Sequence, residues 1–324
     1  MKIALIGKMA ALAAVQVMLL GQVGTAMAQA YPSKPQRLIA MGVGFPETTA
    51  RALGNEISEM TKQAVIVEPR PGANGILAAE YVAKSAPDGY TILIGTNSTH
   101  AANQTLYKTL PYDYVKDFIP VSGVSQGVIL AVVPPQVAAN SIAELTALSK
   151  KTPGKLTFGH GSSSSQAAVE YYKLLTGASF TNVPYKTVPQ ATVDLVAGRL
   201  DFMMVNLGVI MPMVKAGKVR ALAVSGRQRW PLLPDVPTMQ EAGVANYEWS
   251  FWLGAWLPAG TAKDVVTRAN QLVVAALDRP KVKEYLLNSG SIPFPTTSDE
   301  LMKYQISEYE KWRKVILAAG IQAD

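Results

Sequence analysis

The residues best suited to catalysis or ligand binding form one polar run between an apolar stretch and an amphipathic one. This run is Gly159-His160-Gly161-Ser162-Ser163-Ser164-Ser165. A serine hydrolase would need a Gly-x-Ser-x-Gly turn, and the second glycine is missing here. A phosphate loop would need a lysine after its glycine, where Gln166 stands instead. Free backbone N–H groups, hydroxyls and the positive end of a helix dipole remain, and these suit a carboxylate. The simpler alternative is a serine-rich N-cap that only begins the helix.

Two further polar loops follow apolar runs nearer the N-terminus. One spans 44–49 and carries Thr48 and Thr49, and the other spans 96–100 and carries Ser98 and Thr99. Each would follow the C-terminal end of a strand, where open α/β sheets place their ligands. With the serine run they predict helix N-termini that face one cleft from two sides, which favours an anion carboxylated at both ends.

The stretch Gly42-Val43-Gly44 resembles the start of a dinucleotide-binding turn. The third small residue of that fingerprint is replaced by Glu47, whose carboxylate would repel a pyrophosphate. We therefore predict a tight turn and no nucleotide cofactor.

Composition excludes several other classes of site. The 324 residues include no Cys and two His, so disulfides, thiolate nucleophiles and Cys-based metal sites are excluded, and we predict neither a metal nor a cofactor. The 30 Lys and Arg against 23 Asp and Glu are scattered along the sequence, which argues against nucleic acid and favours small anions.

Residues 1–30 are typical of a secretory signal peptide. Lys2 and Lys8 precede an apolar run of about twelve residues, and small residues allow cleavage after Ala28 or Ala30. A retained membrane anchor is the alternative, but the run is shorter than the roughly 20 residues a spanning helix needs. We expect the chain from Tyr31 onward to be exported and free of the membrane.

From Tyr31 onward, short apolar runs alternate with amphipathic stretches, which predicts a mainly parallel sheet covered by helices. Strands are expected at 37–41, 64–67, 91–95, 156–159, 180–184, 202–205 and 221–224. Helices are expected at 50–60, 76–84, 166–175, 191–197, 262–277, 282–287 and 298–319. The last three lack strands of their own and should pack on the first lobe.

The chain should cross between two α/β lobes near 125–135 and again near 245–257. This predicts a signal peptide at 1–30, a first lobe at 31–128 plus 253–324, and a second lobe at 129–252. The second crossing contains an aromatic run from Tyr247 to Trp256 with strand-like alternation. We favour a core role for it over a role as the wall of the cleft.

Several ordered phrases carry a resemblance over nearly the whole mature sequence. They are Arg70-Pro71-Gly72-Ala73, Ala86-Pro87-Asp88-Gly89-Tyr90-Thr91, Leu110-Pro111-Tyr112-Asp113, Val183-Pro184-Tyr185-Lys186 and Leu233-Pro234-Asp235-Val236-Pro237-Thr238. In them the sequence resembles the Bug family, the periplasmic solute-binding proteins of tripartite tricarboxylate transporters.

The resemblance implies a two-lobed, type II-like periplasmic binding-protein fold that closes on a small carboxylate. It further implies a non-enzymatic, monomeric receptor in the periplasm that delivers its ligand to a permease of one large and one small membrane subunit. From the polar loops and the resemblance together, the expected ligand-binding residues are Phe45, Glu47, Thr48, Thr49, Asn97, Ser98, Thr99, Ser162, Ser163, Ser164, Ser165, Tyr185 and Asn206.

The sequence departs from the family pattern at the expected site. The usual Pro-Gly-Gly-x-x-Asp becomes Gly44-Phe45-Pro46-Glu47, and an acid is absent at Val205. The cleft should be less polar than usual, so we predict a dicarboxylate, with aromatic acids such as terephthalate beside the aliphatic ones. Lys186 is the nearest expected cation, which favours acids without an amine unless Glu47 pairs with one. An exported serine hydrolase and the sensor subunit of a signalling system are the alternative functions.

Overall fold

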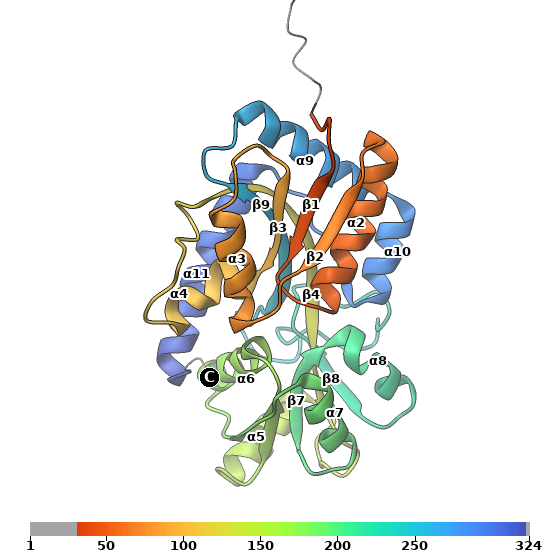
Figure 1. Cartoon of the computed structure of the whole chain (residues 1–324). Helices are drawn as coiled ribbons and strands as arrows, with labels where there is room; N and C mark the ends of the chain where they lie inside the picture. Colours follow the sequence, from red (N-terminus) through yellow and green to blue (C-terminus); the bar gives the residue numbers. More distant parts are fainter. Residues whose placement is uncertain (1–30, 322–324) are drawn as a thin grey trace, which may run out of the picture. The chain divides into compact units, whose positions relative to one another are not determined.

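The structure, a computed structural model of the chain, describes residues 31–321 (Figure 1). The chain divides into two compact units, Met1–Ser33 and Lys34–Asp324. Of the first unit only residues 31–33 are described, and they form no helix or strand. The predicted signal peptide therefore lies outside the described residues, and everything below concerns the second unit.

One sheet organises the described part of this unit. Its main path runs β2-β1-β3-β9-β4-β7-β5-β6, and β8 and β10 both pair with β4. The strands are β1 (Gln36–Ala40), β2 (Val65–Pro69), β3 (Thr91–Thr96), β4 (Phe118–Val133), β5 (Thr157–His160), β6 (Thr181–Pro184), β7 (Phe202–Asn206), β8 (Arg220–Val224), β9 (Ser250–Pro258) and β10 (Ser291–Pro293).

The sheet is parallel at its two ends and antiparallel in its centre. β1 pairs in parallel with β2 and β3, and β5 pairs in parallel with β6 and β7. β9 is antiparallel to both β3 and β4, and β4 is antiparallel to β7 and β8. The expected parallel pairing is thus correct for the βα repeats of each lobe and wrong for β4 and β9, which carry the chain from one lobe to the other.

The long strand β4 belongs to both lobes. It pairs with β9 up to Val128 and with β7 and β8 from Ile129 onward. At this point Ile129 N–H donates to the Ser225 hydroxyl at 2.8 Å, and Ser225 Oγ donates to the carbonyl oxygen of Trp249. Ser225 therefore links β4, along which the chain leaves the first lobe, to the residue before β9, along which it returns. The predicted lobe boundaries remain a prediction, which the change of pairing partner after Val128 supports.

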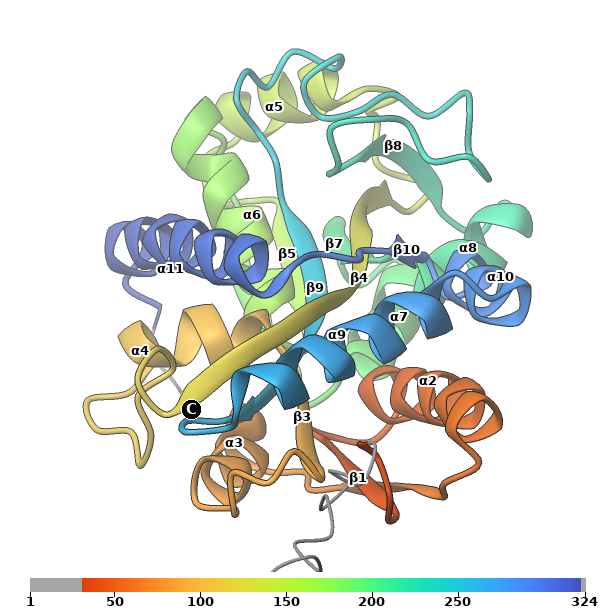
Figure 2. The ribbon, with the colours of Figure 1, turned by 90° about the horizontal axis from the view of Figure 1, so that it is seen from above.

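Helices cover the sheet in both lobes, as Figure 1 shows. They are α2 (Phe45–Thr61), α3 (Ile76–Ala83), α4 (Asn103–Leu106), α5 (Ile142–Lys151), α6 (Ser163–Thr176), α7 (Val188–Val196), α8 (Leu207–Lys215), α9 (Lys263–Leu277), α10 (Pro280–Asn288) and α11 (Ser298–Ala319), with short turns η1 (Ala73–Gly75) and η2 (Ser98–Ala102). As expected, α9 returns to the first lobe, where it lies along β4 (Figure 2) and contacts α2. α11 packs on η2 and β4 but also on α6 of the second lobe.

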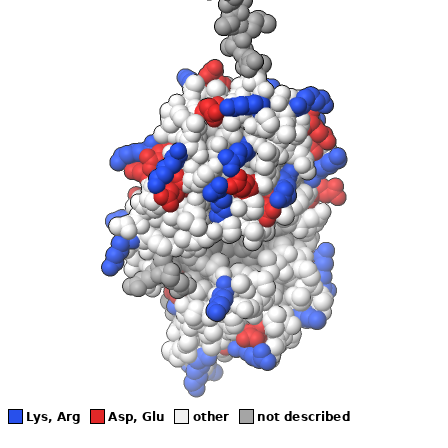
Figure 3. Space-filling view, viewed as in Figure 1, with Lys and Arg blue, Asp and Glu red and all other residues white. Residues whose placement is uncertain are grey.

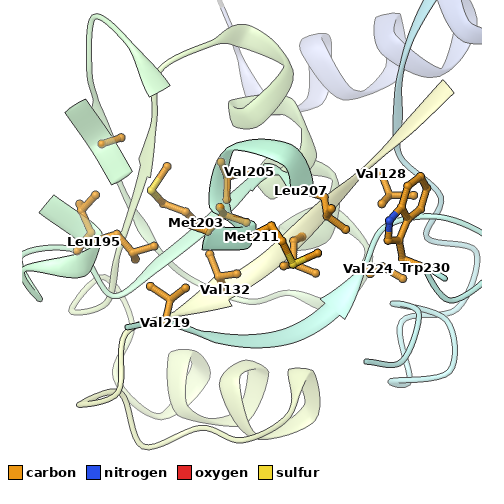
Figure 4. Close-up of a cluster of buried hydrophobic side chains, with 14 residues drawn as sticks. Val128, Val132, Leu195, Met203, Val205, Leu207, Met211, Val219, Val224 and Trp230 are labelled. Atoms are coloured by element: carbon orange, nitrogen blue, oxygen red, sulfur yellow. The ribbon is translucent and has the colours of Figure 1, made fainter. Parts of the chain in front are cut away.

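The second lobe has its own apolar core. Val132 on β4, Met203 and Val205 on β7, Leu195 on α7 and Met211 on α8 point toward one another (Figure 4). Because helices cover both faces of these strands, β7 is apolar at nearly every position rather than alternating.

The aromatic run forms core, as the sequence analysis favoured. Every residue of β9 is buried, and Trp252 and Trp256 are fully enclosed. Their indole N–H groups find acceptors on α11, Trp252 at Glu308 (3.0 Å) and Trp256 at Gln305 (2.9 Å). Such partners are what buried indoles require, so the run fixes α11 against the sheet.

Candidate ligand-binding site

A cavity of about 270 Å³ lies between the lobes. Ala73, Asn74, Leu106 and Tyr107 form its first-lobe wall, and its second-lobe wall is formed by His160, Gly161, Ser162, Ser163, Gln166, Tyr185 and Lys186. Figure 3 shows a shadowed hollow between the upper and lower lobes, bordered mainly by uncharged residues. The volume lies just below the range of about 300–1,000 Å³ usual for drug-sized ligands, so the cavity suits a small metabolite.

A larger open groove of about 710 Å³ runs over Arg37, Arg70 and Tyr81 on the first lobe. Both guanidinium groups are ion-paired with Glu68, and Arg70 also lies over the ring of Tyr81. The residues that line this groove all lie between positions 37 and 91, away from the serine run in sequence, and both guanidinium charges are already paired. We therefore place the candidate site in the smaller cavity between the lobes.

The serine run becomes the turn from β5 into α6. β5 ends at His160, Ser162 is the N-cap of α6, and the helix begins at Ser163. A Cβ on Gly161 would lie 2.1 Å from the carbonyl carbon of Thr187. Only glycine therefore lets this turn approach the β6–α7 loop, which carries Tyr185 and Lys186.

The four serines have different roles. Ser162 Oγ accepts the N–H of Ser165 at 3.2 Å, as the N-cap alternative proposed, while Ser162 and Ser163 also line the cavity. Ser165 is buried and its hydroxyl donates to the carbonyl oxygen of Met204 at 2.7 Å. Ser164 Oγ is buried and has no hydrogen-bond partner among the described residues. Ser162 and Ser163 thus border the cavity, whereas Ser165 links α6 to β7 and its hydroxyl proton is used in that bond.

The β6–α7 loop contributes the aromatic side chain of Tyr185 and the positively charged side chain of Lys186 to the cavity wall. Tyr185 N–H donates to the carbonyl oxygen of His160 at 2.8 Å, and its hydroxyl donates to Asp194 at 2.8 Å. Burial and this bond to Asp194 both raise the pKa of Tyr185. The hydroxyl proton of Tyr185 is used in the bond to Asp194. Among the described residues that line the cavity, Lys186 is the one Lys or Arg, and none is an Asp or Glu.

The first-lobe wall was not predicted. Asn74 lies in a left-handed turn with φ 50°, and its Nδ2 is 3.2 Å from the hydroxyl oxygen of Tyr107. Its backbone carbonyl accepts a bond from the buried Asn103 at 3.2 Å. The glycines on either side of Ala73-Asn74 indicate a turn, but nothing local in the sequence indicates that this turn faces a ligand.

The residues predicted at the start of α2 lie outside the cavity. Phe45 packs edge-on against Phe251, with ring centroids 5.5 Å apart, and Thr48 Oγ1 is 2.6 Å from the hydroxyl of Tyr285. Thr49 is fully buried, with its hydroxyl 3.4 Å from the same tyrosine. Glu47 is ion-paired with Arg51 at 2.7 Å, which weakens the alternative that it holds an ammonium group. The part of these residues in binding stays a prediction.

The loop after β3 also lies mainly in the core. Thr99 is fully buried, and its Oγ1 accepts the backbone N–H of Thr96 at 3.0 Å and lies 2.9 Å from His100 Nδ1. The His100 ring stacks on Trp256 with centroids 3.7 Å apart, and burial lowers the pKa of His100 to about 3. This histidine is therefore neutral and structural.

The remaining predicted residues also miss the cavity. Asn97 is buried, and the N–H of Ser98 donates to Thr96 Oγ1 at 3.1 Å. Asn206 is half-buried where β7 meets α8, and it does not line the cavity. Their role in ligand binding likewise stays a prediction.

Within residues 31–321, no cluster of His, Asp and Glu could hold a metal ion. In the same range, no helix is long and apolar enough to cross a bilayer. The second-lobe wall of the cavity brings together two serines, a glutamine and a lysine.

Comparison with known proteins decides the family. The model of the "Tripartite tricarboxylate transporter family receptor" matches residues 49–321. The chain belongs to this receptor family. BugT of Bordetella pertussis is 31% identical over 301 residues, covering 90% of this chain and 91% of BugT.

Two solved structures are similar to this receptor. Rpa4515 of R. palustris with adipate is 33% identical, with a TM-score of 0.80, and the match covers 90% of this chain and 99% of that one. MatC from Rhodopseudomonas palustris with bound malate is 28% identical, with a TM-score of 0.75 over 88% of this chain and 100% of that one. The predicted Bug-type family and two-lobed fold are confirmed, and the chain is a periplasmic solute receptor, not an enzyme.

Proposed function

We propose that this receptor holds a small organic acid between its lobes, with one carboxylate against Ser162, Ser163 and Lys186. The observation that carries the proposal is the charge of the cavity lining, which within residues 31–321 includes Lys186 and no acid. The N-terminal amides of α6 add a favourable dipole to the same end of the cavity. An amine-bearing ligand would bury its ammonium group without a partner, which is strongly disfavoured.

The ligand class is narrowed by size and by the relatives. Adipate and malate, bound to two similar receptors, are dicarboxylates that a cavity of about 270 Å³ suits. Dicarboxylates are therefore the first probes. Tyr107 and Tyr185 both line the cavity, which supports including aromatic acids such as terephthalate.

We further propose that the lobes close around the ligand and that the monomeric receptor, exported by its signal peptide, delivers it to a permease of one large and one small membrane subunit. Two strand crossings joined by Ser225 make a hinge of the kind that closes around ligands. Delivery to a permease is supported by the family to which the receptor belongs.

Calorimetry on the purified receptor tests the proposed site. We expect saturable binding of one or more of succinate, adipate, malate and terephthalate, with no release of acid from the matching esters. Lys186→Met should weaken that binding by about 1.5–3 kcal/mol, the range for a hydrogen bond to a charged group. Lys218→Met, which removes an exposed lysine of the same lobe outside the cavity, should leave affinity unchanged. Equal affinity in both variants would contradict the placement of the carboxylate.

A further inference from the structure

Tyr185 lines the cavity, and its side chain is anchored outside it. Its backbone N–H donates to the carbonyl oxygen of His160 at the end of β5, and its hydroxyl donates to Asp194 Oδ2 at 2.8 Å. Asp194 lies on α7 and is not among the described residues that line the cavity. The far end of the Tyr185 side chain is therefore held by a residue outside the cavity lining.

The carboxylate of Asp194 has a second partner. Its Oδ1 accepts a bond from Arg199 Nη1 at 2.8 Å, and the backbone N–H of Arg199 donates to the carbonyl oxygen of Asp194 at 2.9 Å. The bonds from Tyr185 and Arg199 lower the pKa of Asp194, so the carboxylate is ionised at neutral pH and only accepts hydrogen bonds. Its two oxygens are divided between the phenol and the guanidinium group.

Asp194 belongs to a helix that the second-lobe core holds in place. Leu195, the next residue along α7, is fully buried in this core, and Tyr185 packs against the same core. α7 also contacts β5, the strand that leads into the serine turn. Because side chains on regular elements are placed more precisely than side chains on loops, Asp194 gives the β6–α7 loop a fixed point of attachment.

The ring of Tyr185 needs such an attachment. Close contact between Gly161 and Thr187 restrains the backbone of the loop, but the Tyr185 side chain is only half-buried, and Pro184 and Lys186 on either side are exposed. A half-buried side chain can change rotamer unless something holds its far end. A ligand that had to immobilise this ring would bind more weakly, because ordering a side chain opposes binding.

We infer that Asp194 is a positioning residue, which holds the Tyr185 side chain in the orientation that the ligand meets before the ligand arrives. This inference deepens the proposed function and rests on it, because the orientation of Tyr185 affects affinity only if the ligand occupies the cavity between the lobes. Asp194 acts through Tyr185 rather than through its charge, which Arg199 offsets.

Two substitutions of Asp194 separate the hydrogen bond from the charge. Asp194→Asn and Asp194→Ala both remove the carboxylate, but asparagine keeps an oxygen that can accept the phenol proton. Calorimetry at pH 7.5 would measure the affinity of both variants for succinate, adipate, malate and terephthalate. For each acid that the wild type binds, Asp194→Ala should bind about two- to tenfold more weakly than Asp194→Asn, the factor that corresponds to ordering one side chain.

The same comparison in the Tyr185→Phe background distinguishes positioning from a general structural role. Phenylalanine has no hydroxyl group to bond to residue 194, so here the two Asp194 variants should bind with equal affinity. Urea unfolding checks that every variant is folded under the conditions of the calorimetry. Asp194→Leu, which has a similar size and no acceptor, replaces Asp194→Ala if the alanine variant does not fold.

Two results would overturn the inference and leave the proposed function intact. One is equal affinity of the alanine and asparagine variants when Tyr185 is present. The other is a difference between them that persists in the Tyr185→Phe background. If the wild type binds none of the four acids, the proposed function fails, and the inference fails with it.

Discussion

At the scale of single residues, two serines of the β5–α6 turn have different roles. Ser165 donates to the carbonyl of Met204 inside the fold, whereas Ser163 lines the cavity. Ser165→Ala should therefore lower the free energy of unfolding by about 1 kcal/mol with little change in affinity, and Ser163→Ala should weaken ligand binding by about 1–3 kcal/mol. Urea unfolding and calorimetry on both variants measure the two effects. The reverse pattern would mean that Ser165 is the ligand donor, as the sequence suggested.

His100 makes stability depend on pH. Burial lowers its pKa to about 3 from an ordinary 6.5, so below pH 6.5 the unfolded chain takes up a proton that the folded chain does not. The free energy of unfolding should fall as pH decreases through this range, by about 1.4 kcal/mol per pH unit from this group. Urea unfolding at pH 7.5, 6.0 and 5.0 measures the slope.

The variant His100→Phe isolates this contribution from that of other titrating groups. Phenylalanine keeps an aromatic ring against Trp256 but cannot be protonated, so the variant should lose less stability than the wild type between pH 7.5 and 5.0. Parallel pH profiles for the two proteins would show that His100 is not the group responsible.

At the scale of elements, most βα units could be predicted and the crossing strand could not. The expected strands at 37–41 and 202–205 match β1 and β7 to within one residue, because buried parallel strands are short apolar runs. β4 runs for 16 residues through Pro120, Gly123 and Gly127, which local rules interpret as breaks. The register shifts at Pro120 and Gly123 absorb the irregularity, and a Cβ on Gly127 would lie 2.0 Å from the ring of Phe251. These glycines reflect tertiary packing that the local sequence does not reveal.

The same distinction applies to the candidate site. The serine turn could be predicted because the strand, the glycine, the N-cap and the helix are consecutive in sequence. Asn74 and Tyr107 are separated by 33 positions and meet only because η1 and α4 fold against each other. The loops 44–49 and 96–100 have suitable side chains, several of which contact α10 or lie in the core, so their part in binding stays a prediction.

The contact between the two second-lobe loops gives a prediction at this scale. Gly161→Ala places a methyl group 2.1 Å from the backbone of Thr187, so the loops must separate. We expect a loss of about 1–3 kcal/mol in unfolding free energy, as for overpacked cores, together with weaker ligand binding. Gly42→Ala, whose added methyl would meet nothing within 4 Å, should leave the melting temperature unchanged. Equal melting temperatures for the two variants would show that the loops can separate freely.

At the scale of the whole receptor, two strands join the parts of the fold that form the walls of the cavity. β4 and β9 carry the chain between the lobes and meet at Ser225, while the walls of the cavity come from opposite lobes. A ligand that bonds to both walls must therefore favour the closed arrangement of the lobes. In Lys186→Met, closure should require more ligand, because the affinity for the carboxylate falls.

Closure around a small organic acid is the central claim, and a scattering titration tests it most directly. Small-angle scattering would be recorded while the receptor is titrated with the acid that binds most tightly in calorimetry. The radius of gyration should decrease and reach its final value at the ligand concentration that saturates the calorimetric signal. An unchanged scattering profile at saturation would contradict a receptor that closes on its ligand.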